Sequence, residues 1–530
     1  MANDMEKKDP ESLTTIMDVL RLRAKNTPGA LAYSIEGKGI TYGRLLDEVL
    51  QAASSLVELG IKKGDRCALI LPTCLDFIRI LYGVQHIGAV PAAVNPGLSP
   101  ELILRRMQAI ACSLAVASGA ALEGLKKAAI KGFTTTPVMS PEEIRILSAN
   151  AARSAIGIDL NDIAYLQFTS GTGGDIKAAV IRHRNLMAHL IVNTDFLGIS
   201  KEDIFVAWLP LYHDLGLVQF VFGPLYSGCP GYLMQPSILN LPKWLETISR
   251  IRGTVTACPD FGYRIAARVV SPDGLDLSSL RIAKNGGEPV RLSTIKHFEQ
   301  RFGLSGVVLP AYGLAEATLS VTCLPPGEPL RVDPKGNVSC GPPLFDTEIK
   351  IVDEKGKRME PGDTGEILIK GPQIFAGYFN DKKATQQVLK NEWHHTGDLG
   401  TLDMDGHLYI FGRKRALIKR AGAIVVPREV EDLADRVEGV RFSAAVGFSP
   451  VKDGPEEVVV AAEVRDGIDA DGLATITRGI MDEIKKGLGF PPFEIVLVSK
   501  GAIPRTPNGK IQYDKLKRLY ASGELGKKRH

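Results

Sequence analysis

The stretch LRIAKNGGEPVRLSTIKHFEQRFG, residues 280–303, decides the fold class. It begins with a short apolar run typical of a buried strand, continues through two adjacent glycines, and ends with the apolar spacing of an amphipathic helix. A strand that leads through a short loop into a helix is the repeating unit of α/β proteins with parallel sheets. Ligands of such proteins bind at loops that follow the carboxyl ends of strands. Gly286 and Gly287 therefore mark a candidate loop on which a flat ring could pack, although glycines also end many strands that bind nothing.

The same alternation of strand-like and helix-like segments extends outward from this stretch. The apolar CALILP of residues 67–72 precedes CLDFIRILYGVQHIG of residues 74–88, which has helical spacing. The pattern changes at residues 338–377, where the strand-like TEIKIVD and GEILIKG are joined by turn sequences. This pattern is typical of a small antiparallel barrel.

The residues after Gly412 form a compact α/β segment of their own. AAVGFSP and EEVVVAAEV are strand-like, and LATITRGIMDEIKKGLG has the spacing of an amphipathic helix. We therefore expect a domain boundary near residues 412–414, with a first domain over residues 1–412 and a second over residues 413–530.

Composition and charge narrow the classes of function. Of the 530 residues, 45% are hydrophobic and 23% are charged, which is ordinary for a globular protein. A net charge of +4 is too small to indicate a nucleic-acid partner. No run approaches the roughly eighteen apolar residues of a transmembrane helix, and the N-terminal residues lack the apolar core of a signal peptide. Seven scattered cysteines without a C-x-x-C pair indicate reduced thiols, so we expect a cytoplasmic protein.

A second candidate loop lies in QFTSGTGGDIKAAV, residues 167–180. Every residue of its TSGTGG segment (169–174) is a glycine or carries a hydroxyl group, so backbone N–H groups and hydroxyls are accessible to phosphate oxygens, and Lys177 adds a positive charge. The P-loop of kinases and ATPases requires G-x-x-x-x-G-K-[ST] before a helix. Here Ile176 takes the place of the second glycine, Ala178 follows the lysine, and the next residues resemble a strand. The P-loop is therefore excluded, whereas a flexible surface hairpin stays an alternative.

Two further segments carry candidate residues. In VVLPAYGLAEAT, residues 307–318, Tyr312 could stack on a base, and Glu316 could ligate magnesium bound to phosphates. A solvated glutamate at a helix start is the alternative. IPRTPNGKIQ, residues 503–512, places Lys510 on an exposed turn, where a lone lysine is usually only solvated.

HHTGDLGTLDMDGHLYIFGRKR, residues 394–415, predicts a hairpin with its turn at Asp405 and Gly406. Pairing of the two strands brings Asp398 beside Arg413. The two side chains could form a simple salt bridge, or they could hold the ribose diol and a phosphate of one nucleotide. The adjacent histidines at the start of the segment do not indicate a metal site, because neighbouring histidines rarely share a metal and no other ligand cluster is evident.

Taken together, these motifs closely resemble those of the adenylate-forming superfamily, which includes acyl-CoA synthetases, fatty acyl-AMP ligases, peptide-synthetase adenylation domains and luciferases. They occur in the family's order over nearly the whole chain, as the Thr/Ser/Gly loop, LPLYHDLGL, NGGEP, AYGLAEAT, TGD, GRKR and PNGK. PLYHDLGLV, GLDLSSLRIAKNGGEPV and AYGLAEATL look most similar to fatty acyl-AMP ligases and long-chain acyl-CoA synthetases. The resemblance implies an α/β fold with a large N-terminal domain of two parallel-type sheets plus a small β-barrel, and a small mobile C-terminal α/β domain.

The resemblance also implies an enzyme reaction in two steps. ATP activates a fatty or other apolar carboxylic acid to an acyl-adenylate with release of pyrophosphate, and the acyl group then moves to a thiol. Mg²⁺ is the expected cofactor, and CoA or the phosphopantetheine of an acyl carrier protein is the expected acceptor. The alternatives are a ligase dedicated to a carrier protein and a non-catalytic protein that binds nucleotide or acyl-adenylate. The linker between residues 318 and 339 is too compact for the complete extra segment typical of carrier-specific ligases, which leaves CoA available as acceptor.

Individual residues receive roles from the same resemblance. The phosphates of ATP are assigned to Thr169, Ser170, Gly171, Thr172, Gly173, Gly174 and Lys177, and Mg²⁺ to Glu316 and Thr172. The adenosine is assigned to Gly287, Glu288, Pro289, Ala311, Tyr312, Gly313, Asp398 and Arg413. Catalysis is assigned to Lys510, which would bridge the acyl carboxylate and the phosphate, to His213, where the acyl chain would meet the adenylate, and to Arg413 and Glu316. The thiol channel is assigned to Lys419 and Gly422, the hinge to Arg415, and the acyl pocket to residues 208–222 and 256–263.

Four positions depart from the family's pattern. Ile176 and Ala178 stand where the phosphate loop usually has proline and glycine. Arg415 replaces the lysine or aspartate of the hinge, and Ala416 replaces an acidic neighbour. Because the loop keeps its hydroxyls and glycines, ATP binding is still expected, whereas rotation about the hinge is less firmly predicted.

Overall fold

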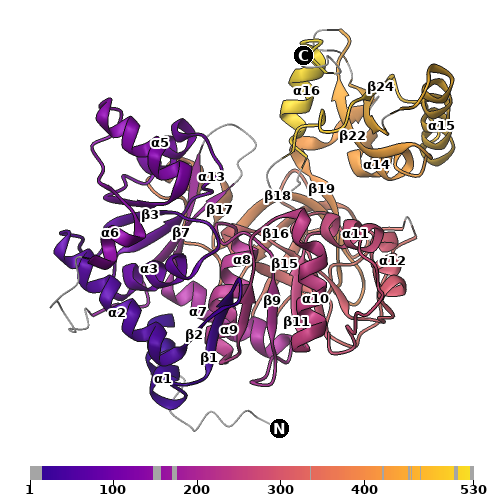
Figure 1. Cartoon of the computed structure of the whole chain (residues 1–530). Helices are drawn as coiled ribbons and strands as arrows, with labels where there is room; N and C mark the ends of the chain where they lie inside the picture. The colour runs from indigo at the N-terminus through magenta and orange to yellow at the C-terminus, as the bar shows by residue number, and fades with distance from the viewer. Residues whose placement is uncertain are drawn as a thin grey trace.

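The protein is a mixed α/β structure with a large N-terminal and a small C-terminal domain, as its computed structural model shows (Figure 1). The predicted fold class is therefore confirmed, while the placement of the boundary near residues 412–414 stays a prediction. The described residues are 15–146, 157–169, 176–334, 336–420, 423–451, 454, 456–465, 467–505 and 511–525. Within these ranges, no helix is both long enough and apolar enough to cross a membrane.

The largest sheet has eight strands in the order β14-β13-β12-β11-β9-β10-β1-β2. The six inner strands of this sheet are parallel to one another, and the edge strands β2 and β14 are antiparallel to their neighbours. The strands are β1 (Leu31–Ile35), β2 (Lys38–Thr41), β9 (Phe205–Ala207), β10 (Gly231–Leu233), β11 (Val255–Cys258), β12 (Ile282–Asn285), β13 (Val308–Gly313) and β14 (Ser320–Cys323).

The second sheet has six strands in the order β6-β5-β3-β4-β7-β8, and only the last pair is antiparallel. Its strands are β3 (Arg66–Ile70), β4 (Val90–Ala93), β5 (Leu114–Ala117), β6 (Val138–Met139), β7 (Ile163–Thr169) and β8 (Lys177–Arg182). The strand and helix predicted within residues 67–88 are thus β3 and α3, as the alternation indicated.

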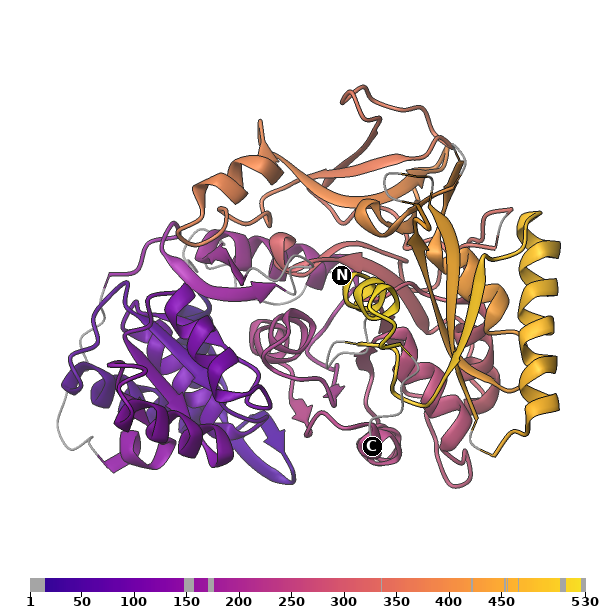
Figure 2. The same cartoon turned by 90° about the horizontal axis from the view of Figure 1, so that it is seen from above.

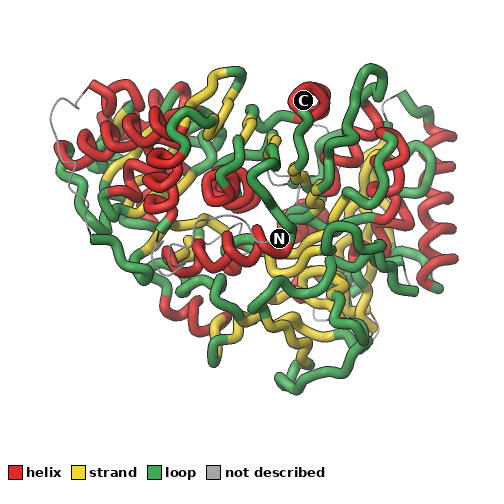
Figure 3. The backbone as a smooth tube through the Cα atoms, turned by 90° about the horizontal axis from the view of Figure 1, so that it is seen from below, coloured by secondary structure: helices red, strands yellow, loops and turns green. Residues whose placement is uncertain are grey.

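Helices surround the strands in both halves of the large domain (Figure 3). The fold-deciding stretch forms β12 and then α12, which ends where Gly303 adopts a left-handed conformation (φ +65°) that favours glycine. The helices are α1 (Ile16–Asn26), α2 (Tyr42–Glu58), α3 (Leu75–His86), α4 (Pro100–Ala109), α5 (Gly119–Ile130), α6 (Pro141–Ile146), α7 (His183–Phe196), α10 (Leu241–Ile251), α11 (Asp260–Val269) and α12 (Leu292–Phe302), with short 3₁₀ turns at Ile238–Asn240 and Ala315–Ala317.

A helical segment between the two sheets leads to the site. α8 (Asp214–Leu217) continues into a π-helix (Val218–Phe222) and α9 (Gly223–Ser227). Phe222 contacts Tyr165 of β7 with ring centroids 5.7 Å apart, and Phe220 contacts Phe205 of β9 at 6.1 Å. The segment therefore packs against both sheets, and Figure 1 shows α8 between β7 and β9.

The strands predicted to form a small barrel make a five-stranded antiparallel sheet. They are β15 (Glu348–Val352), β16 (Gly365–Lys370), β17 (Leu389–Lys390), β18 (Trp393–Leu402) and β19 (Leu408–Arg413), with α13 (Lys382–Val388) between β16 and β17. Seen from above in Figure 2, the long orange strands of this sheet lie along one side of the large domain.

The small domain has its own sheets and its own apolar cores. A 3₁₀ turn (Lys414–Ala416) leads into the hairpin β20 (Ile418–Arg420) and β21 (Ala423–Val425). The rest consists of α14 (Pro427–Ala434), β22 (Val440–Phe448), β23 (Glu457–Val464), α15 (Ala470–Leu488), β24 (Glu494–Val498) and α16 (Tyr513–Ala521). The strands and the amphipathic helix predicted from AAVGFSP, EEVVVAAEV and LATITRGIMDEIKKGLG are therefore confirmed.

A buried carboxyl gives the stability of the small domain a pH dependence. Glu431 of α14 is 3% exposed and accepts hydrogen bonds from the backbone N–H of Ala445 and the hydroxyl of Tyr513, both at 3.0 Å. Burial raises the pKa of Glu431 to about 7. Because the folded protein favours the protonated form, the stabilisation is present below the unfolded pKa of about 4.3 and is lost as the pH rises through about 7.

Glu431→Gln is expected to remove this pH dependence, because the amide keeps an acceptor for both contacts and does not ionise. Relative to the variant, the free energy of unfolding of the unmodified protein should fall by on the order of 2–3 kcal/mol between about pH 5 and about pH 8. Urea unfolding of both proteins at both pH values measures the difference. If the two proteins differed in free energy of unfolding by the same amount at both pH values, Glu431 would have the same pKa in the folded protein as in the unfolded chain.

Candidate active site

The phosphate-loop candidate connects two antiparallel strands. β7 ends at Thr169 and β8 begins at Lys177, and these two residues are directly paired in the sheet. The prediction of a strand rather than a helix after the loop is therefore confirmed, and with it the exclusion of a P-loop. Ser170, Gly171, Thr172, Gly173 and Gly174 lie outside the described residues.

Tyr378 joins the end of this hairpin to the magnesium candidate. The ammonium of Lys177 lies 5.0 Å from the centre of the Tyr378 ring, and the Tyr378 hydroxyl donates to Oε1 of Glu316 at 2.8 Å. An isolated β-bridge between Ala179 and Tyr378 fixes the backbone of the tyrosine beside β8. Lys177, Glu316 and Tyr378 are thus brought together from three distant parts of the chain.

Sequence reasoning missed Tyr378. The residue follows Gly377 directly after the segment assigned to the barrel, and its position depends on the bridge to β8 rather than on any local pattern. In the sequence, Tyr378 is marked only as an aromatic residue after a glycine at the end of a strand-rich segment. This pattern is a weak indication of a functional residue.

The backbone next to Glu316 is strained. Thr318 is fully buried and has φ +64° and ψ −54°, a conformation that is unusual for a β-branched residue. Its hydroxyl donates to the carbonyl of Gln373 at 2.7 Å. Strained residues of this kind persist where the surroundings fix them, often at functional sites. The strain here accompanies a tight turn that holds Glu316 at the end of β13.

Asp398 and Arg413 are neighbours, as the hairpin predicted. They are paired in the register of β18 and β19, and Arg413 Nε lies 2.8 Å from Asp398 Oδ1. The hydroxyl of Tyr312 donates to the other carboxylate oxygen at 2.5 Å. Asp398 is buried, whereas the Arg413 side chain is half-exposed. The carboxylate is therefore held from two sides by groups that the sequence placed in separate motifs.

Arg413 links the two clusters. Burial alone would lower the pKa of Arg413, but the nearby Asp398, followed by Tyr312, Glu316 and Tyr378, raises it. Next to these groups, burial lowers the pKa of His394 to about 4, so its imidazole is neutral at physiological pH. Among the residues that the structure describes, no three His, Cys, Asp or Glu side chains converge on one metal position.

The loop after β12 lies close to the end of β13. A Cβ atom at Gly286 would lie 2.7 Å from the carbonyl oxygen of Ala311, so only glycine permits this approach. Glu288 accepts a hydrogen bond from the backbone N–H of Phe261, and burial, followed by the nearby Asp260, raises its pKa to about 7. The predicted adenine residues Gly287, Glu288, Pro289, Ala311, Tyr312 and Gly313 therefore belong to two adjacent strand ends.

His213 stands at the start of the helical segment between the sheets. It precedes α8, and its Nδ1 lies 2.6 Å from Oδ1 of Asp214. The carbonyl before it, that of Tyr212, accepts a hydrogen bond from Gln167 of β7 at 3.0 Å. His213 is thus anchored to the strand that leads into the phosphate-loop candidate.

The two segments predicted to wall an acyl pocket lie side by side. β9 and β11 are hydrogen-bonded neighbours, and the ring of Trp208 packs edge-on against Phe261 at a centroid distance of 6.3 Å. Trp208 also contacts Trp244, and Trp244 contacts Tyr263. These walls are aromatic and apolar, which suits an apolar ligand.

Two of the remaining predicted residues, Arg415 and Lys419, are described. Arg415 is exposed within the 3₁₀ turn after β19, and Lys419 is exposed on β20, where its backbone N–H donates to Glu456 at 2.9 Å. Gly422 and Lys510 lie outside the described residues. Of the departures from the family pattern, Ala178 is a buried residue of β8 paired with Phe168, and Ala416 ends the 3₁₀ turn.

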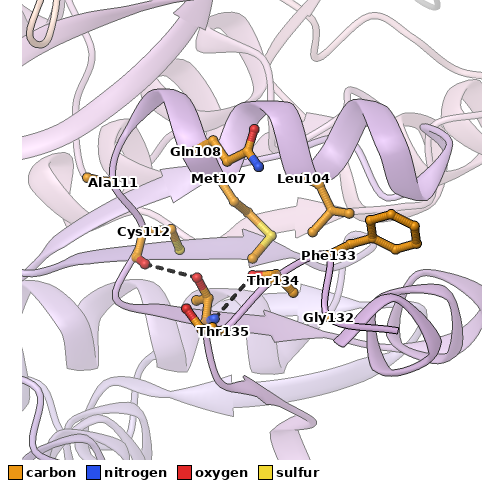
Figure 4. A pocket seen from close by; sticks show the side chains of 10 residues that line it. Leu104, Met107, Gln108, Ala111, Cys112, Gly132, Phe133, Thr134 and Thr135 are labelled. Carbon is orange, nitrogen blue, oxygen red and sulfur yellow. Dashed lines mark hydrogen bonds between the residues drawn. The ribbon is translucent and has the colours of Figure 1, made fainter. Parts of the chain in front are cut away.

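An open pocket elsewhere on the large domain contains none of the predicted residues. It lies between α4 and the loop of residues 132–136, and Figure 4 shows Met107 and Leu104 pointing toward it. The hydroxyl of Thr136 donates to the carbonyl of Cys112 at 3.3 Å, and its backbone N–H donates to Thr134 at 3.1 Å. These groups satisfy one another and do not extend the site.

The converging residues carry both positive and negative charge and lie on or beside three sheets: the six-stranded, the eight-stranded and the five-stranded. Lysine and arginine side chains can hold phosphate oxygens, a carboxylate held by Tyr312 and Arg413 can accept hydrogen bonds from sugar hydroxyls, and a second carboxylate can ligate a divalent cation. The donor set therefore fits a nucleotide with a bound Mg²⁺, with Glu316 as the cation ligand among the described residues.

The chain matches known proteins over most of its length. The model of a family described as AMP-binding enzyme matches residues 20–379. A putative acyl-CoA synthetase from Caulobacter vibrioides is 29% identical over 97% of this chain and 96% of its own length. The medium-chain-fatty-acid–[acyl-carrier-protein] ligase JamA from Moorena producens is also 29% identical, with the same coverage of both chains. A solved structure described under fatty acyl-adenylate ligases from E. coli and L. pneumophila superposes with a TM-score of 0.85, at 27% identity, over 96% of this chain and 98% of its own.

Proposed function

The chain belongs to the family of AMP-binding enzymes, and from this premise we propose that it activates a fatty or other apolar carboxylic acid with ATP. The products of the first step are an acyl-adenylate and pyrophosphate. In the second step a thiol displaces AMP and takes the acyl group. The convergence of Lys177, Glu316 and Tyr378 with Arg413 and Asp398 is the observation that carries the proposal.

In the first step, one carboxylate oxygen of the acid attacks the α-phosphorus, and the bond between that phosphorus and the bridging oxygen of pyrophosphate breaks. Negative charge on the phosphate oxygens is then spread over fixed donors and cations, which is the main source of rate enhancement in such transfers. The hydroxyls and backbone of residues 169–174, with Lys177, hold the β- and γ-phosphates. Lys510 contacts both the attacking carboxylate and the α-phosphate.

The adenosine is held beside these groups. Asp398 accepts hydrogen bonds from the ribose hydroxyls, while Arg413 and Tyr312 orient its carboxylate. The adenine packs between the loop after β12 and Tyr312. Glu316 would hold Mg²⁺, which would neutralise phosphate charge. His213 marks the place where the acyl chain, lying against Trp208 and Phe261, meets the phosphate.

In the second step, the thiolate sulfur attacks the acyl carbon, and the bond between that carbon and the oxygen of AMP breaks. The domain division at residues 412–414 allows the small domain to present Lys510 in one step and the hairpin of β20 and β21 in the other, by rotation about Arg415. Gly422 then lines the channel through which the pantetheine thiol reaches the adenylate.

Replacing Gly422 with phenylalanine is expected to separate the two steps. A bulky side chain in the channel leaves pyrophosphate release unchanged but lowers thioester formation by about 100-fold or more, because the sulfur no longer reaches the acyl carbon. Both rates are measured in one reaction, so pyrophosphate release is the internal control. An unchanged thioester yield would remove Gly422 from the channel.

The compact linker leaves CoA available as the acceptor, and the similarity to a carrier-protein ligase makes an acyl carrier protein the other candidate. One reaction distinguishes them. The protein is incubated with ATP, Mg²⁺, CoA and a mixed pool of fatty and aromatic acids, and the products are identified by mass spectrometry. An acyl-CoA names the acid and establishes CoA. Acyl-adenylate that accumulates without acyl-CoA indicates a carrier protein.

If no pooled acid raises AMP formation above the acid-free control, the non-catalytic alternative, a protein that only binds nucleotide or acyl-adenylate, replaces the proposal.

A further inference from the structure

The small domain rests on the large domain through charged residues of α14. Arg291 immediately precedes α12, and its Nε lies 2.7 Å from Oδ1 of Asp432 in α14. Its Nη2 lies 3.6 Å from Oδ2 of Asp435, the residue that follows α14. The Arg291 side chain is only 20% exposed. Figure 1 shows α14 above α11 and α12.

Two more arginines complete the contact. Arg264 of α11 places Nη1 3.7 Å from Oδ2 of Asp435, and its guanidinium lies 5.9 Å from the ring centre of Phe442. From the small domain, Arg428 donates to the carbonyl of Val290 and also lies 3.3 Å from Asp432. Complementary charges therefore contribute to the contact between the domains.

The same arginine is tied to the loop after β12, which the proposed function places against the adenine. Fully buried Asp260 accepts hydrogen bonds from the backbone N–H of Arg291 at 3.0 Å, from Asn285 at 3.2 Å and from Thr294 at 2.9 Å. Asn285 and Arg291 are the two ends of this loop, so one carboxylate fixes both ends. The guanidinium of Arg291 lies 3.9 Å from Asp260 as well.

We propose that Arg291 is a positioning residue that couples the adenine loop to the docked position of the small domain through Asp432. The effect of this coupling on the reaction rests on the proposed function, because the two steps of that reaction need the small domain in different positions. While the Arg291–Asp432 pair is formed, the small domain stays in the position seen here, and the pair must break before the domain turns. A partly buried, hydrogen-bonded ion pair is strong enough to bias such an equilibrium and weak enough to release it.

Asp432→Asn tests the docking without altering the adenine loop. Trypsin cleavage after the exposed Lys414 and Arg415 reports release of the small domain, because a protease needs the hinge segment free. We expect the variant to be cleaved about tenfold faster, the effect of losing one charged hydrogen bond. We also expect added salt to accelerate cleavage of the unmodified protein more than that of the variant. Asp482→Asn, at an exposed aspartate of α15, is the matched control.

Two readouts keep the docking and the coupling separate. Equal cleavage of Asp432→Asn and the control would overturn the docking contact, whether or not the protein forms acyl-adenylate. For the coupling, the rates of adenylate formation and of thioester formation from supplied adenylate are compared. We expect their ratio to change by about tenfold in Asp432→Asn and by less in Arg291→Lys, which keeps the charge. Faster cleavage with an unchanged ratio would overturn the coupling. Absence of acid-dependent ATP cleavage in the unmodified protein would instead overturn the proposed function.

Discussion

Replacing Lys510 with alanine is expected to lower acyl-adenylate formation by about 100-fold or more, while transfer of supplied acyl-adenylate to the thiol continues. The reason is that the ammonium acts on charge that develops only in the first step, between the attacking carboxylate and the α-phosphate. In the proposed second step the leaving group is AMP, and the proposed rotation turns the hairpin of β20 and β21, rather than Lys510, toward the site.

The two half-reactions are measured separately, the first by acid-dependent exchange of labelled pyrophosphate into ATP and the second by thioester formation from synthetic acyl-adenylate. Lys500→Ala is the matched control, because Lys500 is an exposed lysine that, like Lys510, lies between β24 and α16 in the sequence. Equal loss of both half-reactions in Lys510→Ala would show that the lysine supports the fold of the small domain and not the first step.

Asp398→Asn is expected to lower kcat/KM for ATP by about 100-fold. The amide keeps the size of the side chain but replaces one acceptor oxygen by a donor, which faces either the Arg413 guanidinium at 2.8 Å or the Tyr312 hydroxyl at 2.5 Å. The loss of one hydrogen bond to a charged group, worth about 1.5–3 kcal/mol, corresponds to roughly 13- to 160-fold and sets the size of the loss.

Steady-state kinetics with varied ATP at saturating acid measure this effect. Asp363→Asn, at an exposed aspartate in the turn before β16, controls for the loss of a negative charge from the same sheet. Tyr312→Phe should lose less, about tenfold, because the carboxylate keeps Arg413. If Asp398→Asn changed thermal stability but not kcat/KM for ATP, the pair of Asp398 and Arg413 would be a structural salt bridge, the alternative that the sequence left open.

The parts of the site that sequence reasoning placed correctly depend on local rules. The turn at Asp405 and Gly406 set the register of β18 and β19, and the register set the contact between Asp398 and Arg413. Two glycines after an apolar run marked the loop beside β13. The alternation of strands and helices gave the fold class, because each unit can be recognised within about twenty residues.

The parts that were missed depend on contacts between distant segments. Tyr378 reaches Glu316 only because its backbone bridges to Ala179 of β8. The positive φ of Thr318 is imposed by the turn and by Gln373, and nothing in the local sequence calls for it. Arg291 and Asp432 lie in different domains, so their pairing follows from the docking of those domains and from no motif.

The transfer of an oxygen label tests the central claim most directly. Once a substrate acid is identified, it is supplied with ¹⁸O in both carboxyl oxygens, together with ATP, Mg²⁺ and the thiol acceptor, and the nucleotide product is analysed by mass spectrometry. If the carboxylate attacks the α-phosphate and the thiol then cleaves the acyl–oxygen bond, one ¹⁸O atom remains on AMP for each thioester formed. AMP without the label, or ADP accompanied by labelled inorganic phosphate, would contradict formation of an acyl-adenylate at this site.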